Sequence, residues 1–368
     1  MKFDRKYIEI SHYLLKKVLG TSFPNPPVVC LVVESDKDFR RHKIISFGIT
    51  ALTGRPHAEA IALKGLKLSE DKMYSLYTTL EPCCHHGRDK SCVSKILKKK
   101  INRIVCSLKD PDSRMNGKGL TILRNNGLEV INGVLEKEIK DFYEGYFINR
   151  KHNRPKVTLK IGCSLDGKIT FRSNQRSQIT NGLSKKLVHI YRSECDAVLI
   201  GSNTIKVDNP KLNCRIRGLE KYSPYRIILS KSLDFNLSSE IFKNCKRSLT
   251  IVFTKRNKNI KIKRLIDKGV KIFMLEEKNY NLSFILKKLA EMGVCNLLVE
   301  GGSKVFTSFI KESLVDQILI FRSNFFVGPT GLDILVQSAY NHIEKKFYLK
   351  KLDYVDNNIL EIFDKRKL

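Results

Sequence analysis

Apolar and polar residues alternate along the first 150 residues in blocks that predict strands and helices in turn. Short apolar runs between turn residues are typical of buried strands, whereas apolar residues three and four apart are typical of helices. The predicted strands are 28–33, 73–80, 101–108 and 128–133. The predicted helices are an amphipathic one at the N-terminus, with Ile8, Leu14, Leu15, Val18 and Leu19 as its apolar residues, and then 57–68, 91–100 and 119–126. This alternation predicts a layered α/β domain.

A second series of strands and helices follows the polar stretch 149–155, which ends in Pro155 and which we interpret as a linker. A strand begins at 156, and further predicted strands are 196–202, 225–230, 249–254, 271–275, 295–302 and 316–323. The predicted helices are 184–194, 282–292 and 303–311. The pattern predicts a second α/β domain with a mainly parallel sheet. We therefore expect domains at 1–148 and 156–368, joined by 149–155.

The length and composition agree with two folded domains. The chain has 368 residues and is 42% hydrophobic, at a size of roughly 100–200 residues per domain. Its formal charge of +31 makes nucleic acid the first partner to consider. However, the excess of Lys and Arg is spread over both halves and forms no dedicated patch. We therefore expect no nucleic-acid partner, and a surface that attracts small phosphorylated substrates.

The cysteines and the apolar runs indicate a cytoplasmic protein. Ten Cys occur without regular spacing, which favours reduced thiols and metal ligands over a secreted disulfide framework. The N-terminus has no uninterrupted apolar core of signal-peptide length. No apolar run reaches the length that spans a membrane, so no membrane association is expected.

The most specific motif is His57-Ala58-Glu59, followed by Glu81-Pro82-Cys83 and then Cys92. This order of H-x-E and P-C with a later Cys is the signature of zinc deaminases. A catalytic zinc keeps three protein ligands and leaves one position for water, so His57, Cys83 and Cys92 are the expected ligands. Glu59 lies two residues from the ligand histidine and is the expected catalytic acid and base.

Each of these residues, taken alone, has another interpretation. A lone histidine is more often part of a core, and a lone cysteine is often a small buried hydrophobe. Cys84 adjoins Cys83 and is an alternative ligand, although Cys83 is the residue that follows Pro82. His85 and His86 fit substrate contact or solvent exposure better than zinc binding. The complete set in this order favours the zinc site.

The first half resembles a known family beyond the zinc motif. The shared residues are Pro24-Asn25-Pro26, Gly54-x-Pro56-His57-Ala58-Glu59, Thr79-Leu80-Glu81-Pro82-Cys83-x-His85-His86-Gly87-Arg88, Cys92, Asp110-Pro111 and Gly117-x-Gly119. Eight residues separate Cys83 from Cys92, where most nucleoside and nucleic-acid deaminases have C-x-x-C. The chain thus resembles the bifunctional riboflavin-biosynthesis deaminase/reductase family.

The second half carries the rest of this resemblance. The shared residues are Lys160-x-Gly162-x-Ser164-Leu165-Asp166-Gly167, Arg192, Asp196-Ala197, Gly201, Thr204, Asp208, Pro210, Leu212, Arg215, Glu300-Gly301-Gly302 and Leu314-Val315-Asp316. The resemblance implies a cytidine-deaminase-like three-layer domain followed by a dihydrofolate-reductase-like α/β domain that binds NADPH. It also implies a homo-oligomer, either a dimer or a tetramer.

The resemblance also implies roles for particular residues. The cofactor-binding set is Cys163, Thr204, Asp208, Gly302 and Ser303. The substrate-binding set is Asn25, His86, Arg88, Lys160, Arg192, Leu212, Arg215 and Glu300. From the residues alone, Glu300-Gly301-Gly302 between a strand and a helix suits a phosphate or an ordinary strand-to-helix turn. Arg192 and Arg215 suit phosphate contacts or a solvent-exposed surface.

The chain departs from the family pattern at several positions. Val29 stands where a Gly is usual, Asn209 and Ser230 where an Asp is usual, and Asn324 where a Pro is usual. The run 173–180, Ser-Asn-Gln-Arg-Ser-Gln-Ile-Thr, stands where the family has Ser-Gly-Glu-Ser-x-Trp-Ile-Thr, and the chain has no Trp.

The implied reactions use 2,5-diamino-6-ribosylamino-4(3H)-pyrimidinone 5′-phosphate. The first domain is expected to remove an exocyclic amine by hydrolysis, and the second to reduce the ribosyl group to ribityl with NADPH. The alternatives are an active deaminase half with a degenerate reductase half, a nucleic-acid deaminase, and a binding module with a structural zinc site.

Overall fold

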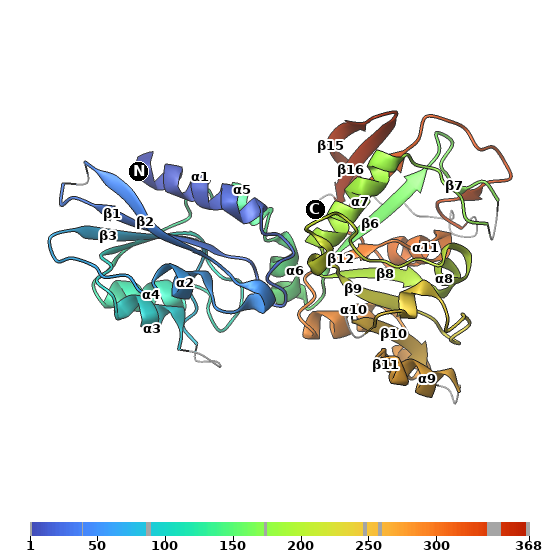
Figure 1. The fold of residues 1–368 in the computed structure, drawn as a ribbon, viewed down its shortest axis with the longest axis horizontal. Helices are drawn as coiled ribbons and strands as arrows, with labels where there is room; N and C mark the ends of the chain where they lie inside the picture. Colours follow the sequence, from blue (N-terminus) through green and yellow to red (C-terminus); the bar gives the residue numbers. More distant parts are fainter. Residues whose placement is uncertain are drawn as a thin grey trace. The chain divides into compact units, whose positions relative to one another are not determined.

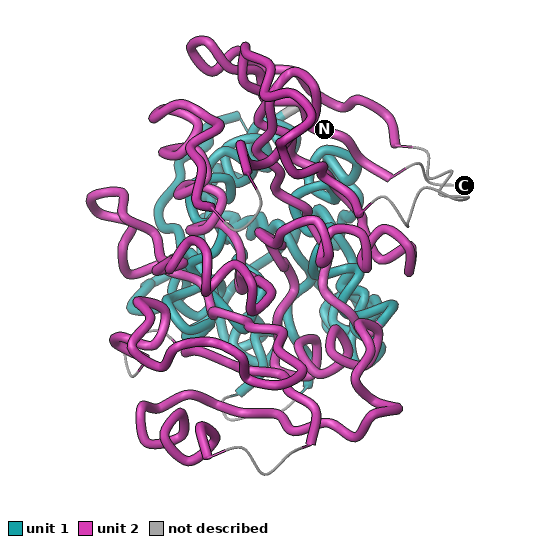
Figure 2. The backbone as a smooth tube through the Cα atoms, turned by 90° about the vertical axis from the view of Figure 1, so that its right-hand side faces the viewer, with its two compact units in different colours: residues 1–152 teal, residues 153–368 magenta. Residues whose placement is uncertain are grey.

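The structure is a computed structural model that describes residues 2–38, 40–85, 90–172, 175–245, 249–256, 260–336 and 347–365. The chain divides into two compact units, Met1–His152 and Asn153–Leu368, which Figure 2 colours separately. Each unit has a central sheet with helices against it (Figure 1). No helix in these described ranges is long and apolar enough to cross a membrane.

The first unit is built on a five-stranded mixed sheet in the order β2-β1-β3-β4-β5. Its strands are β1 (Val29–Ser35), β2 (His42–Ile49), β3 (Met73–Leu80), β4 (Arg103–Leu108) and β5 (Glu129–Asn132). β1 pairs antiparallel with both β2 and β3, while β3, β4 and β5 run parallel. The parallel strands all end at one edge, and Glu81-Pro82-Cys83 follows β3 there.

Helices cover both faces of this sheet. They are α1 (Lys2–Lys16), α2 (Ala58–Ala62), α3 (Cys92–Leu97), α4 (Lys118–Asn125), α5 (Glu136–Lys140) and α6 (Glu144–His152). α1 and α5 lie on one face, and α2, α3 and α4 lie on the other (Figure 1). Alternate side chains of β1, such as Cys30 and Val32, pack against Ala58 and Ala62 of α2. The predicted three-layer arrangement is therefore confirmed.

The second unit is built on a nine-stranded sheet in the order β11-β10-β9-β8-β12-β6-β13-β16-β15. Its strands are β6 (Lys156–Cys163), β8 (Ala197–Gly201), β9 (Tyr225–Leu229), β10 (Thr250–Lys255), β11 (Lys271–Leu275), β12 (Asn296–Val299), β13 (Gln317–Arg322), β15 (Phe347–Val355) and β16 (Asn358–Lys365). All neighbours from β11 to β13 are parallel, and only β16 and β15 are antiparallel. The predicted mainly parallel sheet is confirmed.

The helices of the second unit connect these parallel strands. They are α7 (Gly182–Glu194), α8 (Ser202–Asp208), α9 (Lys261–Asp267), α10 (Leu282–Glu291) and α11 (Ser303–Lys311), and a small separate sheet joins β7 (Lys168–Thr170) to β14 (Leu332–Asp333). α7 packs on the sheet through Val188, in one core with Phe321 of β13 and Leu360 of β16. α8 and α11 each follow directly after a parallel strand, so their N-termini lie at the same edge of the sheet.

Two expectations about local structure were wrong. The stretch 149–155 is not a linker throughout, because residues 149–152 form the last turn of α6. Asn149 is buried, and the basic residues that follow it suit the negative end of a helix, so polarity there reflects the helix end and not a loop. The helix expected over 57–68 ends at Ala62, and Gly65 three residues later has a positive φ of 72°.

Candidate active sites

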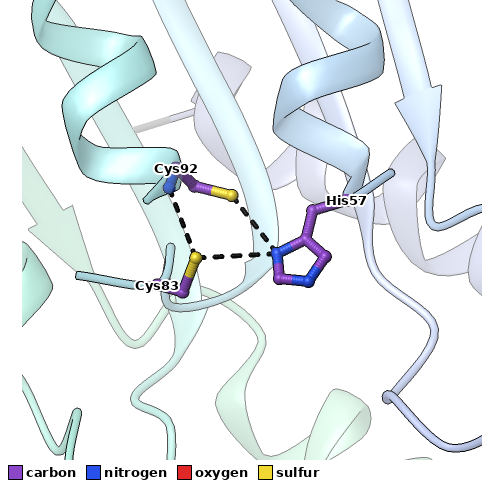
Figure 3. Close-up of side chains that lie close together, drawn as sticks. All are labelled: His57, Cys83 and Cys92. Atoms are coloured by element: carbon purple, nitrogen blue, oxygen red, sulfur yellow. Dashed lines mark hydrogen bonds between the residues drawn. The ribbon is translucent and has the colours of Figure 1, made fainter. Parts of the chain in front are cut away.

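His57, Cys83 and Cys92 come from three separate segments and converge in the first unit (Figure 3). The ring atom Nδ1 of His57 lies 3.6 Å from Cys83 Sγ and 3.4 Å from Cys92 Sγ. The backbone N–H of Cys92 donates to Cys83 Sγ at 3.3 Å. The three ligand atoms all lie within 4.8 Å of one another. One imidazole nitrogen and two sulfurs at this spacing suit a single zinc ion.

Short helices position His57 and Cys92. His57 is the N-cap of α2 and has an extended backbone. Cys92 is the first residue of α3, whose N-cap Ser91 accepts a hydrogen bond from the backbone N–H of Ser94. Both residues therefore lie at helix N-termini, where the peptide dipoles favour thiolate and carboxylate.

Glu81 fixes the turn that carries Cys83. Its carboxylate accepts hydrogen bonds from the backbone N–H groups of Asp110 at 3.1 Å, Gly117 at 2.8 Å and Gly119 at 2.9 Å. A β-carbon on Gly119 would lie 2.5 Å from the carbonyl oxygen of Pro82, so only glycine fits there. Two of the shared motifs thus contact each other directly: Glu81-Pro82-Cys83 and Gly117-x-Gly119.

Glu59 lies beside the cluster without belonging to it. It is the second residue of α2, and its side chain is buried. The Cys92 thiol donates to Glu59 Oε2 at 3.3 Å. Burial raises the pKa of Glu59, and the charge of Cys83 raises it further. A buried carboxyl group at this place is suited to accept and return a proton.

The pKa values of the two cysteine thiols shift in opposite directions. The hydrogen bond from the Cys92 thiol lowers the pKa of Cys83 to about 4, and His57 contributes to the same effect against the opposing effect of burial. The hydrogen bond to Cys83 and burial both raise the pKa of Cys92. A bound cation would stabilise both sulfurs in the deprotonated thiolate form. The donor set therefore fits zinc.

Cys84 does not belong to the cluster, because its side chain contacts other residues. Cys84 Sγ contacts Met115 Sδ at 3.7 Å and the carbonyl oxygen of Arg114 at 3.9 Å. The structure therefore brings Cys83, and not Cys84, to His57. Asn25 donates to the carbonyl oxygen of Gly54 at 2.8 Å, and its amide nitrogen lies 3.5 Å from the second ring nitrogen of His57. The expected substrate residues His86 and Arg88 lie outside the described residues.

Basic side chains surround the entrance to this cluster. The small pocket at the site is lined by Arg55, His57, Cys83, His85, Lys90, Cys92 and Lys95. No described acidic side chain is part of this lining. The entrance therefore favours an anionic substrate.

A cavity of about 940 Å³ lies at the carboxyl edge of the parallel sheet in the second unit. This edge is where open α/β sheets bind ligands. Eight residues that were expected in the reductase site line the cavity together: Lys160, Thr204, Asp208, Leu212, Arg215, Arg192, Glu300 and Gly302. The volume and the mixed polar lining suit a nucleotide-sized ligand beside a second molecule.

Glu300 and Arg192 form the most buried charged pair of this cavity. Arg192 Nε and Nη2 donate to the two carboxylate oxygens of Glu300 at 2.6 and 2.9 Å. Arg192 Nη1 also donates to the carbonyl oxygen of Asn213, and Lys160 Nζ lies 3.7 Å from Glu300. Burial acts to raise the pKa of Glu300, but the charges of Arg192 and Lys160 lower it to about 2. Arg192 thus orients Glu300 with two of its nitrogens.

Two expected cofactor residues lie apart from this lining. Cys163 is fully buried at the end of β6, and burial raises the pKa of its thiol to about 11. Ser303, the first residue of α11, is buried and its hydroxyl donates to the carbonyl oxygen of Asp333. The structure therefore gives Ser303 a contact that holds β14 beside α11.

The turn before α11 fits the close approach of a phosphate. A β-carbon on Gly301 would lie 2.6 Å from Val305 Cβ, so this residue must be small to pack. Gly302 is different, because no atom lies within 4 Å of its β-carbon position. Open backbone at a helix N-terminus is suited to the phosphates of a dinucleotide, so the residues present fit NADPH.

Among the cavity residues to which the sequence reasoning gave no role are Lys185 and His189. Lys185 and His189 lie four residues apart on α7, and Arg192 follows three residues later, so the three share a helix face. That spacing was the available signal. It was missed because isolated basic residues on a helix are usually solvent-exposed.

The family models that match the chain agree with this division. A model described as the cytidine and deoxycytidylate deaminase zinc-binding region matches residues 1–108, and the RibD C-terminal domain matches residues 155–360. The riboflavin biosynthesis protein RibD of Aquifex aeolicus is 40% identical over 333 residues, 90% of each chain. The RibD of Bacillus amyloliquefaciens is 31% identical over 89% of this chain and 86% of its own.

Solved structures give the same result for the whole length. The chain is similar to a Thermotoga maritima diaminohydroxyphosphoribosylaminopyrimidine deaminase/5-amino-6-(5-phosphoribosylamino)uracil reductase, with a TM-score of 0.83, 32% identity and 99% of each chain covered. It is also similar to form 1 of Acinetobacter baumannii RibD, with a TM-score of 0.88, 26% identity, and 100% of this chain and 99% of that chain covered. The chain therefore belongs to the RibD family of riboflavin-biosynthesis enzymes, which join a zinc-dependent deaminase to an NADPH-dependent reductase.

Proposed function

We propose that the first unit deaminates 2,5-diamino-6-ribosylamino-4(3H)-pyrimidinone 5′-phosphate, with zinc held by His57, Cys83 and Cys92. The observation that supports this most directly is the convergence of these three ligand atoms beside the buried Glu59. When bound, zinc acidifies a water molecule for attack on the ring carbon that carries the exocyclic amine.

Glu59 moves the protons of this reaction. It accepts a proton from the attacking water and passes one to the amine, which leaves as ammonia while the ring gains a carbonyl oxygen. Its burial keeps bulk water from competing for the proton. Asn25 holds the Gly54 turn beside His57, which keeps the imidazole in position. His86 and Arg88 remain proposed substrate contacts on the basis of the family resemblance.

We propose that the cavity of the second unit reduces the ribosyl group of the deaminated product. When bound, NADPH would supply a hydride to the sugar carbon C1′, while the C1′–O4′ bond of the ring opens and the ring oxygen takes up a proton. Thr204, Asp208 and Gly302 are the proposed cofactor side, together with Cys163 and Ser303 as residues behind the lining. Lys160, Leu212, Arg215 and Glu300 are the proposed substrate side, with Arg192 orienting Glu300.

The zinc ligands can be tested without an activity measurement. Cys83→Ala and Cys92→Ala should each lose the single zinc ion that wild type holds, because a three-ligand site cannot spare a thiolate. Metal content after gel filtration measures this. Cys84→Ala is the matched control and should keep its zinc, since Cys84 faces Met115. Loss of zinc from Cys84→Ala but not from Cys83→Ala would show that the ligand assignment is wrong.

We also propose that the protein is cytoplasmic. All ten cysteines are free, which suits a reducing compartment.

We further propose that the protein forms a homodimer through the second unit. Leu349, Leu352 and Tyr354 lie on one face of β15, in register with Phe363, Glu361 and Ile359 of β16, and are 51%, 45% and 83% exposed. The opposite face is covered by α7. Arg322 and Glu361 on this face form an ion pair, so their charges offset each other and the face stays largely apolar.

Leu352→Lys should convert the dimer to a monomer, because it places a cation in the centre of this apolar face. Light scattering after gel filtration measures the mass. Ile260→Lys is the control, since Ile260 is 73% exposed at the start of α9 and belongs to another surface. Equal masses for wild type and Leu352→Lys would exclude this face as the interface.

A further inference from the structure

Tyr143 lies between α5 and α6, and its side chain is buried in the first unit. Its backbone belongs to both helix ends, because its N–H donates to the carbonyl oxygen of Lys140 and its own carbonyl oxygen accepts from the N–H of Phe147. Its hydroxyl group reaches two segments that are distant in the sequence, since Pro27 is 116 positions away and Thr79 is 64 positions away. The hydroxyl group of Tyr143 thus joins three segments of the unit.

The hydrogen bonds of this hydroxyl group run in one direction. The carbonyl oxygen of Pro27 can only accept, and it lies 2.6 Å from the Tyr143 oxygen, so Tyr143 donates its proton there. The Tyr143 oxygen therefore accepts from the Thr79 hydroxyl, which is 2.9 Å away. Thr79 Oγ1 in turn accepts from the backbone N–H of Val29 at 3.1 Å. Burial raises the pKa of Tyr143, so its hydroxyl group stays protonated and continues to donate.

This series of hydrogen bonds begins and ends on the same stretch of backbone. It starts at the N–H of Val29, the first residue of β1, and ends at the carbonyl oxygen of Pro27, two residues earlier. Val28 lies between them, and its N–H donates to Thr50 Oγ1 at 2.9 Å while its carbonyl oxygen accepts from the Thr50 N–H at 3.0 Å. The backbone at 27–29 is therefore fixed by side chains as well as by the sheet.

The fixed backbone leads directly to Asn25, which lies beside His57. Asn25 precedes Pro26 and Pro27, whose rings lock their own φ angles and also restrict the residue before each of them. Few dihedral angles are therefore free between Pro27 and Asn25. The Asn25 amide nitrogen donates to the carbonyl oxygen of Gly54 at 2.8 Å and lies 3.5 Å from His57 Nε2. A displacement of Pro27 would thus move Asn25 relative to His57.

We propose that Tyr143 is a positioning residue of the deaminase, whose hydroxyl group holds Pro27 in place and thereby fixes Asn25 beside His57. The inference rests on the proposed function of the first unit, in which Asn25 holds the turn beside His57 and is an expected substrate contact. Tyr143 acts through Pro27 and is therefore not a catalytic residue. The same contacts give a role to Thr79, the first residue of the shared motif that leads to the cysteine ligand, because its hydroxyl group orients that of Tyr143.

Hydrogen exchange, measured by mass spectrometry on the full-length protein loaded with zinc, tests this geometry without any turnover. Tyr143→Phe keeps the ring and removes only the hydroxyl group, so the backbone N–H groups of segment 25–29 should exchange about tenfold faster. Tyr77→Phe is the matched control, because Tyr77 is another buried tyrosine of the first unit, and its hydroxyl group donates to Asp4. It should leave exchange in segment 25–29 unchanged. Equal exchange in Tyr143→Phe and wild type would overturn the proposal.

Thr79 supplies a second pair of variants that remains informative if Tyr143→Phe does not fold. Thr79→Val has nearly the same size but no hydroxyl group, so it should speed exchange of segment 25–29 by a similar factor. Thr79→Ser keeps the hydroxyl group and should exchange as wild type does. Equal exchange in these two variants would show that the series of hydrogen bonds does not hold the segment.

The kinetics of ammonia release then test whether Tyr143 acts through Asn25. Tyr143→Phe should lower kcat/KM by about tenfold at an unchanged zinc content, whereas Tyr77→Phe should not lower it. In an Asn25→Ala background, Tyr143→Phe should have little further effect, because residues that act as a unit are not additive. A double variant in which the two separate losses multiply would overturn the proposal. If Tyr143→Phe speeds exchange although wild type releases no ammonia, the contact that fixes Asn25 stands and the proposed deaminase function fails.

Discussion

Glu59→Gln should abolish deamination while leaving zinc and the reductase untouched. Glutamine keeps the size and hydrogen bonding of the side chain but cannot accept a proton at neutral pH. Ammonia release should fall by at least about 10²–10⁴-fold, the range for losing a general acid and base. Zinc content should equal that of wild type, because Glu59 is not one of the three ligand residues. NADPH oxidation with supplied deaminated product should also be unchanged, since every described residue that lines that cavity belongs to the second unit.

Each readout of this variant tests a separate claim. Glu70→Gln is the control, because Glu70 is an exposed carboxylate paired with Lys100. Loss of zinc in Glu59→Gln would make Glu59 a ligand or a structural residue. Persistent ammonia release would mean that another base acts, with His86 as the next candidate. Loss of NADPH oxidation would show that the two units are coupled.

Glu300→Gln should destabilise the second unit more than any other single change considered. The substitution leaves the buried Arg192 without its carboxylate, and breaking a buried ion pair in this way costs about 3–5 kcal/mol. The melting temperature of this unit should fall by roughly 6–20 °C. Scanning calorimetry measures the shift. Glu240→Gln is the control, because its ion pairs with Lys211 and Lys243 are near the surface and should contribute little. Equal melting temperatures for Glu300→Gln and wild type would contradict the central role given to this pair.

The same carboxylate predicts how stability depends on pH. The pKa of Glu300 is about 2 in the folded protein, below its ordinary value of 4.5. A group with a lowered folded pKa stabilises the protein fully above its unfolded pKa and loses this effect as pH falls towards the folded one. The second unit should therefore lose stability between about pH 4.5 and 2 in wild type. Glu300→Gln should show a smaller loss over that range.

The sequence predicted the buried elements well and the half-exposed ones poorly. β3 is found at Met73–Leu80, where a continuous apolar run predicted it. β2 (His42–Ile49) was not predicted, because its residues are mostly exposed or half-buried and show no clean alternation. The hairpin of β15 and β16 was missed for the same reason, since β15 mixes lysines with exposed apolar residues.

The two sites differed in how much could be read from the sequence. The zinc ligands lie within 36 positions and follow an ordered motif, so residue types and spacing were sufficient to propose them. The pairing of Arg192 with Glu300 joins residues 108 positions apart through the order of the parallel strands. No local pattern reveals it, and Arg192 was expected to contact phosphate directly. Lys185 and His189 were given no role by the sequence reasoning, although both line the cavity.

The central claim is that one chain carries both activities, each in its own unit. A paired assay tests it most directly: ammonia release from the diaminopyrimidine 5′-phosphate without NADPH, and NADPH oxidation with the deaminated product supplied. The account predicts that wild type gives both signals and that Cys83→Ala loses only the first. Ammonia release without any NADPH oxidation would contradict it, and would favour the alternative of an active deaminase half with a degenerate reductase half.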